Sequence, residues 1–120
     1  MDGAVCKLVL VVEDDTDVRD GLVAVLERAG YLVAQAGNGR DALMLAKAMR
    51  PSVILLDLMM PIMDGWQFRA IQRGDTAIRD VPVIVLSATV LKLEELRPAA
   101  ALSKPFDLGT LLQAVDRIAA

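Results

Sequence analysis

The chain has 120 residues, the size of one ordinary domain, and we expect a single domain over residues 1–120. A hydrophobic content of 55% with only 3% aromatic residues predicts a large aliphatic core. The formal net charge is -3 and the Lys and Arg residues are scattered, which argues against a nucleic-acid-binding surface. The absence of histidine excludes a histidine base, a histidine metal ligand and a phosphohistidine on this chain.

The sequence gives no sign of a membrane or secreted protein. No apolar run approaches the length needed to cross a bilayer. The N-terminus lacks the basic region and long apolar stretch of a signal peptide. The single Cys6 cannot form an internal disulfide and suits a reducing compartment. We therefore expect a cytoplasmic protein with no membrane partner.

Five short apolar segments are typical of buried parallel strands, because β-branched residues and leucine dominate most of them. They cover residues 8–12, 31–35, 53–57, 81–86 and 99–103. The last is the weakest of the five, because it consists mainly of alanine.

Helical spacing of apolar residues follows each strand. The first helix is expected after a cap at Asp15 or Thr16 and before Gly30. Pro51 limits the second helix, the third is expected at 65–73, and a short fourth at 90–97 ends before Pro98. The expected inward-facing residues are Val18, Leu22, Val25 and Leu26; Ala42, Ala46 and Met49; Phe68 and Ile71; and Leu108, Leu111, Leu112, Val115 and Ile118.

This alternation of strand and helix predicts an α/β fold. We expect a doubly wound, five-stranded parallel sheet with helices on both faces and a shortened fourth helix. In such sheets, ligands bind outside the carboxyl ends of the strands. The residues at those ends are therefore candidates for function.

Polar residues stand where four of the predicted strands end. Glu13 and Asp14 follow the first strand, and Asp57 closes the third. Ser87 follows the fourth strand, and Lys104 follows the fifth. If these strands are neighbours, their ends bring an acidic pair, a third acid, a hydroxyl and an amine to one pocket.

This pocket suits phosphoryl chemistry assisted by a metal ion. Carboxylates at Glu13, Asp14 and Asp57 repel one another, and Mg²⁺ relieves that repulsion by accepting oxygen ligands. Asp57 can then attack phosphorus to form an aspartyl phosphate. Lys104 can pair with the new negative charge, and Ser87 can donate a hydrogen bond to a phosphate oxygen.

These residues resemble the receiver domain of two-component response regulators over nearly the whole chain. The resemblance rests on Val12-Glu13-Asp14, on the Met-Pro and Met-Asp-Gly of segment 57–65, on Leu86-Ser87-Ala88 and on Lys104-Pro105-Phe106. Each motif is common by itself, but four of them in the family's order, each at a strand end, are specific. The resemblance implies the flavodoxin-like receiver fold. It also implies a signalling phosphoacceptor of a phosphorelay that supports its own phosphoryl transfer and autodephosphorylation, rather than an enzyme.

The resemblance further implies a role for each acid. Asp57 would receive a phosphoryl group from a histidine kinase or a histidine phosphotransfer protein. Glu13 and Asp14 would be the acids on the metal side, and the backbone carbonyl of Met59 would be another Mg²⁺ ligand. We expect Glu13 to act through water, because its reach differs from that of an aspartate.

The remaining implied roles concern the response to phosphorylation. Ser87 would be the switch hydroxyl, and Lys104 the phosphate-pairing lysine before a cis proline. Thr89 and Met59 occupy positions that tune phosphate lifetime in the family. A possible output domain or partner protein would read the result, and we expect partner contact around Arg19 and Val23 on the first helix.

Each residue also has a plainer interpretation when it is taken alone. Residues 13–15 can simply cap the first helix, where acids favour the positive end of the dipole. Ser87 can be a helix cap, and Lys104 can be a solvated lysine beside a turn. A metal-dependent aspartyl phosphatase is a distant alternative, because such enzymes carry a second acid at the position of Met59.

The sequence departs from the family at two places. Ala101 stands where receivers usually have Tyr or Phe, three residues before the lysine. The segment between Ser87 and Lys104 is also shorter than usual, and the loss falls on the fourth helix. Both departures lie on the face that most receivers use for output. They keep open a second hypothesis, a receiver-like protein-interaction module with atypical or vestigial phosphorylation switching.

Overall fold

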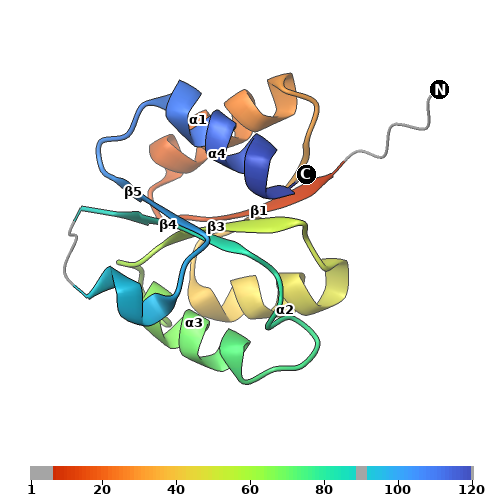
Figure 1. Cartoon of the computed structure of the whole chain (residues 1–120), viewed down its shortest axis with the longest axis vertical. Helices are drawn as coiled ribbons and strands as arrows, with labels where there is room; N and C mark the ends of the chain where they lie inside the picture. The colour runs from red at the N-terminus through yellow and green to blue at the C-terminus, as the bar shows by residue number, and fades with distance from the viewer. Residues whose placement is uncertain (1–6, 89–91, 120) are drawn as a thin grey trace.

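A parallel β-sheet forms the centre of the molecule. The computed structural model describes residues 7–88 and 92–119, and its five strands have the order β2-β1-β3-β4-β5 (Figure 1). The strands are β1 (Leu8–Val12), β2 (Leu32–Ala36), β3 (Val53–Asp57), β4 (Val83–Ser87) and β5 (Ala100–Ser103). The five predicted strands and the parallel topology are confirmed, because every expected segment overlaps an observed strand.

Helices cover both faces of the sheet. They are α1 (Thr16–Arg28), α2 (Gly39–Met49), α3 (Gly65–Arg73) and α4 (Leu108–Ala119). Figure 1 shows α1 and α4 on one face, and α2 and α3 on the other. Alternate strand residues fill the two layers: Leu10 and Val12 pack with α2 and α3, whereas Val9 and Val11 pack with α1 and α4. The doubly wound architecture is confirmed, since side chains alternate across a sheet that is buried on both sides.

The fourth helix predicted at 90–97 is wrong as an α-helix. The structure has a single 3₁₀ turn, η1 (Leu93–Leu96), and residues 90 and 91 lie outside the described residues. Lys92 and Arg97 flank η1 with φ angles of 61° and 47°, in the left-handed region. A residue in this region ends helical geometry, and Pro98 offers no N–H to continue it. Among the described residues 92–103, the segment before Lys104 therefore has one 3₁₀ turn where the sequence predicted an α-helix.

The inward face of α3 also differs from the prediction. Phe68 is buried as expected, but Ile71 is 44% exposed, and Arg69 and Gln72 are buried in its place. Met49 and Leu108, also expected inside, are exposed. A prediction from the spacing of apolar residues assigns polar residues to solvent. It therefore missed Arg69 and Gln72, whose polar groups form hydrogen bonds inside the protein.

Arg69 and Gln72 bind backbone carbonyls at η1 and in the loop before β4. Arg69 donates from Nε to the Leu96 carbonyl and from Nη2 to the Arg97 carbonyl, each at 2.8 Å. Its Nη1 donates to Gln72 Oε1 at 2.8 Å. Gln72 Nε2 donates to the Ile78 and Val81 carbonyls at 3.0 Å. This network, the α3 clamp, attaches η1 and the loop before β4 to α3.

No helix in residues 7–88 and 92–119 is both long enough and apolar enough to span a membrane.

Candidate functional site

The register of the sheet places the polar strand ends side by side. Val12 pairs with Leu56, so Glu13 follows β1 beside Asp57 at the end of β3. Asp57 pairs in turn with Leu86, directly before Ser87. Ser87 pairs with Ser103, directly before Lys104. The predicted convergence of these residues at one edge of the sheet follows from this register.

The acidic run after β1 divides into two parts. Asp15 is the N-cap of α1 and accepts hydrogen bonds from the backbone N–H groups of Asp17 and Val18 at 3.0 and 3.1 Å. Glu13 and Asp14 instead take part in a cluster with Asp57. The helix-cap interpretation therefore holds for Asp15, and the expectation of pocket acids holds for its two predecessors.

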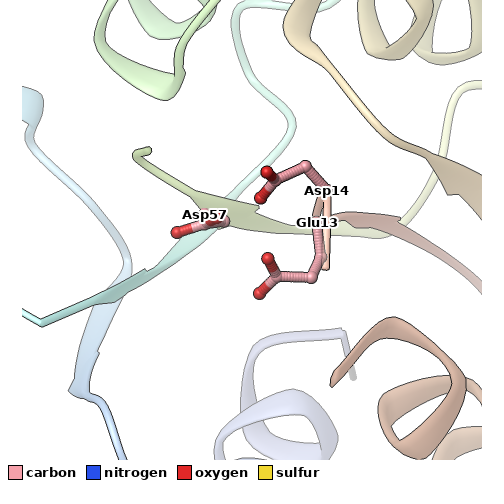
Figure 2. Close-up of side chains that lie close together, drawn as sticks. All are labelled: Glu13, Asp14 and Asp57. Atoms are coloured by element: carbon pink, nitrogen blue, oxygen red, sulfur yellow. The ribbon is translucent and has the colours of Figure 1, made fainter. Parts of the chain in front are cut away.

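Glu13, Asp14 and Asp57 form a candidate metal centre. Each offers one carboxylate oxygen, and the three oxygens lie within 4.8 Å of one another. Figure 2 shows the carboxylates gathered where β1 and β3 end. Glu13 and Asp57 are only 1% and 4% exposed, whereas Asp14 is open to solvent. A hard cation such as Mg²⁺ fits this set, because it prefers oxygen ligands and keeps waters on its open side.

Lys104 supplies the opposing charge. Its Nζ lies 2.8 Å from Glu13 Oε1 and 3.2 Å from Asp57 Oδ1, and its side chain is 26% exposed. The peptide bond from Lys104 to Pro105 is cis, as the resemblance implied. The expectation that this ammonium offsets the negative pocket in the resting protein is met by these contacts.

Burial and the facing charges shift the pKa values of both Glu13 and Lys104. Burial raises the pKa of Glu13 to about 7, the hydrogen bond from Lys104 opposes that shift, and the neighbouring charge of Asp57 adds to it. Burial alone lowers the pKa of Lys104, but its bonds and charge interactions with Glu13 and Asp57 outweigh burial and raise it. Burial therefore sets the direction of the pKa shift for Glu13, whereas the two facing carboxylates set it for Lys104.

Ser87 and Met59 lie at the same edge. Ser87 is the buried last residue of β4, and its carbonyl accepts a hydrogen bond from the Lys104 amide at 2.8 Å. The Met59 N–H approaches Asp57 Oδ1 at 3.4 Å, while its side chain is 75% exposed. Metal ligation by the Met59 carbonyl stays a prediction. Thr89 lies outside the described residues.

The loop after β3 requires glycine at position 65. A Cβ on Gly65 would lie 2.6 Å from the Asp57 carbonyl oxygen, which is closer than atoms can approach. The Gly65 N–H also donates to the Leu58 carbonyl at 3.0 Å. Asp64 and Gln67 then form a capping box that starts α3. The Asp-Gly pair therefore folds the chain back tightly against Asp57 and its loop.

Sequence reasoning missed the position of Arg19. We expected it to face a partner, but its guanidinium turns back and donates from Nη1 to the Glu13 carbonyl at 3.0 Å. Spacing along α1 gave no signal for this contact, because the acceptor is a backbone atom of the preceding loop. The expectation of a partner surface around Arg19 and Val23 stays a prediction.

The comparison with protein families decides which family this fold belongs to. The model of the response regulator receiver domain matches residues 9–116. The chain belongs to this family. Its receiver fold places Glu13, Asp14 and Asp57 together in the acidic pocket described above. It is a signalling module of the two-component type rather than an enzyme in the usual sense.

Curated relatives of this receiver domain differ in length. Protein PilH of Pseudomonas aeruginosa is 32% identical over 117 residues, covering 93% of this chain and 97% of PilH. The transcriptional regulator RpaA of Synechocystis is 34% identical over 112 residues, covering 89% of this chain and 46% of RpaA. The chain therefore spans about half the length of some curated relatives and nearly all of others.

Solved structures resemble this receiver domain closely. Chemotaxis response regulator CheY4 of Vibrio cholerae has a TM-score of 0.87 and 32% identity, covering 95% of this chain and 99% of CheY4. The receiver domain of sensor histidine kinase PA1611 from P. aeruginosa has a TM-score of 0.87 and 28% identity, covering 96% and 98%. That relative was solved with a magnesium ion coordinated in its active-site cleft.

Proposed function

We propose that this receiver domain accepts a phosphoryl group on Asp57, in a Mg²⁺-dependent reaction, from a histidine kinase or a histidine phosphotransfer protein. The observation that carries the proposal is the position of the Asp57 carboxylate. It lies at the end of β3, within 4.8 Å of carboxylate oxygens of Glu13 and Asp14, and 3.2 Å from Lys104 Nζ. A nucleophile, a cation site and a fixed ammonium thus share one pocket.

The proposed step balances as a phosphoryl transfer. An Asp57 carboxylate oxygen attacks phosphorus, the bond from phosphorus to the donor imidazole nitrogen breaks, and that nitrogen keeps the electron pair. Glu13, Asp14 and Asp57 would hold Mg²⁺, with the Met59 carbonyl as a further ligand. The bound ion would neutralise charge on the phosphoryl oxygens.

Lys104 and Ser87 would then stabilise the product. The Lys104 ammonium already contacts Asp57 and Glu13, and it would pair with the phosphoryl oxygens once they are present. Ser87, at the end of β4, would donate its hydroxyl to a phosphoryl oxygen. Attack of water on the aspartyl phosphate would return the domain to its resting state without a separate enzyme.

A second candidate function has its own supporting observation. Ala101 has no ring to change position on phosphorylation, and η1 offers a single turn in place of a full fourth helix. These features favour a receiver-like interaction module in which phosphorylation switching is atypical or vestigial. In the vestigial form of this second candidate, Asp57 gains no phosphoryl group, and this separates it from the first.

Intact-mass measurement after treatment with acetyl phosphate and Mg²⁺ separates them. The unaltered domain should gain one phosphoryl group, and Asp57→Asn should gain none. Asp20→Asn, which removes an exposed acid of α1, is the matched control and should behave like the unaltered domain. Equal phosphorylation of Asp57→Asn would overturn the proposed acceptor. A folded domain that gains no phosphoryl mass would favour the interaction module.

A further inference from the structure

Every backbone and side-chain polar atom of Glu13 has a partner. Its N–H donates to the Ala36 carbonyl at 3.0 Å, and its carbonyl accepts from Arg19 Nη1 at 3.0 Å. Oε1 accepts from Lys104 Nζ at 2.8 Å, and Oε2 accepts from the Asp15 N–H at 3.2 Å. Arg19 supplies the only one of these contacts that comes from α1, and its acceptor is the carbonyl of the peptide between Glu13 and Asp14.

Asp14 depends on that peptide for its direction. Within residues 7–88 and 92–119, its carboxylate makes no hydrogen bond or ion pair, although one of its oxygens belongs to the acidic cluster. An exposed side chain without a partner rotates about its χ angles, so its backbone decides where the Cα–Cβ bond points and which region the carboxylate can reach. The backbone that carries Asp14 is held by the Arg19 contact with the Glu13 carbonyl.

The position of Arg19 is itself constrained. A Cβ placed on Gly37 would lie 3.2 Å from Arg19 Nη1. The guanidinium therefore lies close to the backbone of Gly37, in space that the side chain of a larger residue would partly fill. Arg19 Nε is buried and has no hydrogen-bond partner among the described residues. Burying a donor without an acceptor costs free energy of folding. The arginine would avoid this cost by extending into water, so its preference for water does not explain its position.

We propose that Arg19 is a positioning residue for the metal-side acids of this pocket. It holds the peptide between Glu13 and Asp14 and thereby directs the Asp14 carboxylate toward the cation site. The inference rests on the proposed Mg²⁺ site and adds a residue outside the acidic cluster to it. Partners that orient metal ligands typically change metal affinity by about 10- to 100-fold when they are lost.

Charge and positioning predict opposite effects of removing Arg19. A guanidinium near the pocket repels a divalent cation, so its loss would tighten Mg²⁺ binding if charge were its main influence. Loss of positioning would weaken Mg²⁺ binding, because Asp14 would have to be ordered when the ion binds. The direction of the change in affinity therefore tests the role.

Calorimetric titration of the unphosphorylated domain with Mg²⁺ is the test. Arg19→Met should weaken binding about tenfold. Arg19→Lys keeps a donor and the charge but lacks the flat guanidinium, so it should give an intermediate affinity. Gly37→Ala keeps the arginine and its charge but requires a small shift of the guanidinium, so it should weaken binding less than Arg19→Met does. The control Arg28→Met, at the exposed end of the same helix, should bind within about twofold of the unaltered domain.

Amide hydrogen exchange without Mg²⁺ provides a second readout. The amides of Asp14 and Asp15 should exchange faster in Arg19→Met, while amides of β3 should not change. Unchanged or tighter Mg²⁺ binding by Arg19→Met would overturn the inference, as would an equal loss in Arg28→Met. If Arg19→Met does not fold, Arg19→Lys and Gly37→Ala decide by the same criteria. A domain that binds Mg²⁺ but gains no phosphoryl group on Asp57 would overturn the proposed function. The role of Arg19 in Mg²⁺ binding would still be decided by the affinities of the Arg19 variants.

Discussion

Two cationic side chains, Lys104 in the pocket and Arg69 in the α3 clamp, are held in contrasting ways. Lys104 contacts the carboxylates of Glu13 and Asp57 and stays 26% exposed. Arg69 is 7% exposed, and the described residues give it no carboxylate. Its acceptors are neutral oxygens of Leu96, Arg97 and Gln72, at 2.8 Å each.

The difference suits the two side chains to different roles: Lys104 can exchange one ionic partner for another, whereas Arg69 keeps a fixed set of hydrogen bonds. Lys104 is one ammonium shared between two carboxylates and partly open to solvent, so under the proposed function a metal ion or a phosphoryl group would rearrange this pairing. Burial, with the nearby charge of Arg73, lowers the pKa of Arg69. The hydrogen bonds of Arg69 link α3 to η1, so its role is to hold the shortened segment in place.

The largest expected effect is on stability, from Arg69→Met. The variant removes the donors of two backbone carbonyls and of Gln72 Oε1 in a largely buried network, which should cost about 3 kcal/mol in the free energy of unfolding. Its Mg²⁺ affinity should stay within about twofold of the unaltered domain, because the clamp does not contact the pocket. Urea unfolding measures the first quantity and calorimetry the second.

Arg73→Met is the matched control for Arg69→Met. Arg73 is an exposed neighbour on α3 that makes one hydrogen bond, at 3.1 Å, to the Glu95 carbonyl. Its loss should cost less than about 1 kcal/mol. If both variants lost the same stability, burial of the Arg69 network would not be the cause.

The next effect is on switching, from Lys104→Ala. We expect this variant to fold, to bind Mg²⁺ about tenfold more tightly because a nearby positive charge is gone, and to lose most of the coupling between phosphorylation and conformation. Trp66 fluorescence with beryllofluoride, a phosphate mimic, follows that coupling, since Trp66 packs against the core on the α3 side. Lys47→Ala, which removes an exposed lysine of α2, is the control. An unfolded Lys104→Ala would mean that the lysine is structural.

Glu13→Gln should change how stability depends on pH. The pKa of Glu13 is about 7 in the folded protein and near 4.5 when unperturbed, so the folded state binds more protons between these values. This contribution to stability is fully present below pH 4.5 and is lost as pH rises through 7. Without Mg²⁺, Glu13→Gln should remove that decline. Urea unfolding at several pH values measures it, and an identical decline in both proteins would contradict the assigned group.

The smallest effect is expected at Ala101. This exposed residue of β5 should tolerate Ala101→Tyr with less than about 0.5 kcal/mol change in stability and no change in Mg²⁺ affinity. We also expect no dimer through the face formed by η1, β5 and α4, with or without beryllofluoride, because η1 is one turn long. Sedimentation measures the association. A phosphate-dependent dimer disrupted by substitution of Leu93, and not of Val23 on α1, would show this expectation to be wrong.

The sequence alone determined the sheet and the candidate site. Asp57, Ser87 and Lys104 each stand at the end of an apolar run. The buried strand and its polar residue are adjacent in the chain, so both can be recognised from a short stretch of sequence. Parallel pairing then places the strand ends at one edge without further information. For that reason the acidic cluster and the lysine contact could be predicted before any distance was known.

Only the tertiary structure decided how the polar side chains are used. Arg69 binds carbonyls that lie 27 and 28 positions away in the chain, so no periodic pattern on α3 reveals it. Arg19 binds a backbone atom of the preceding loop beside a glycine of another loop. Backbone acceptors leave no trace in residue identity, since every residue has a carbonyl. A sequence therefore shows which groups are available for bonding, whereas the folded chain decides which of them meet.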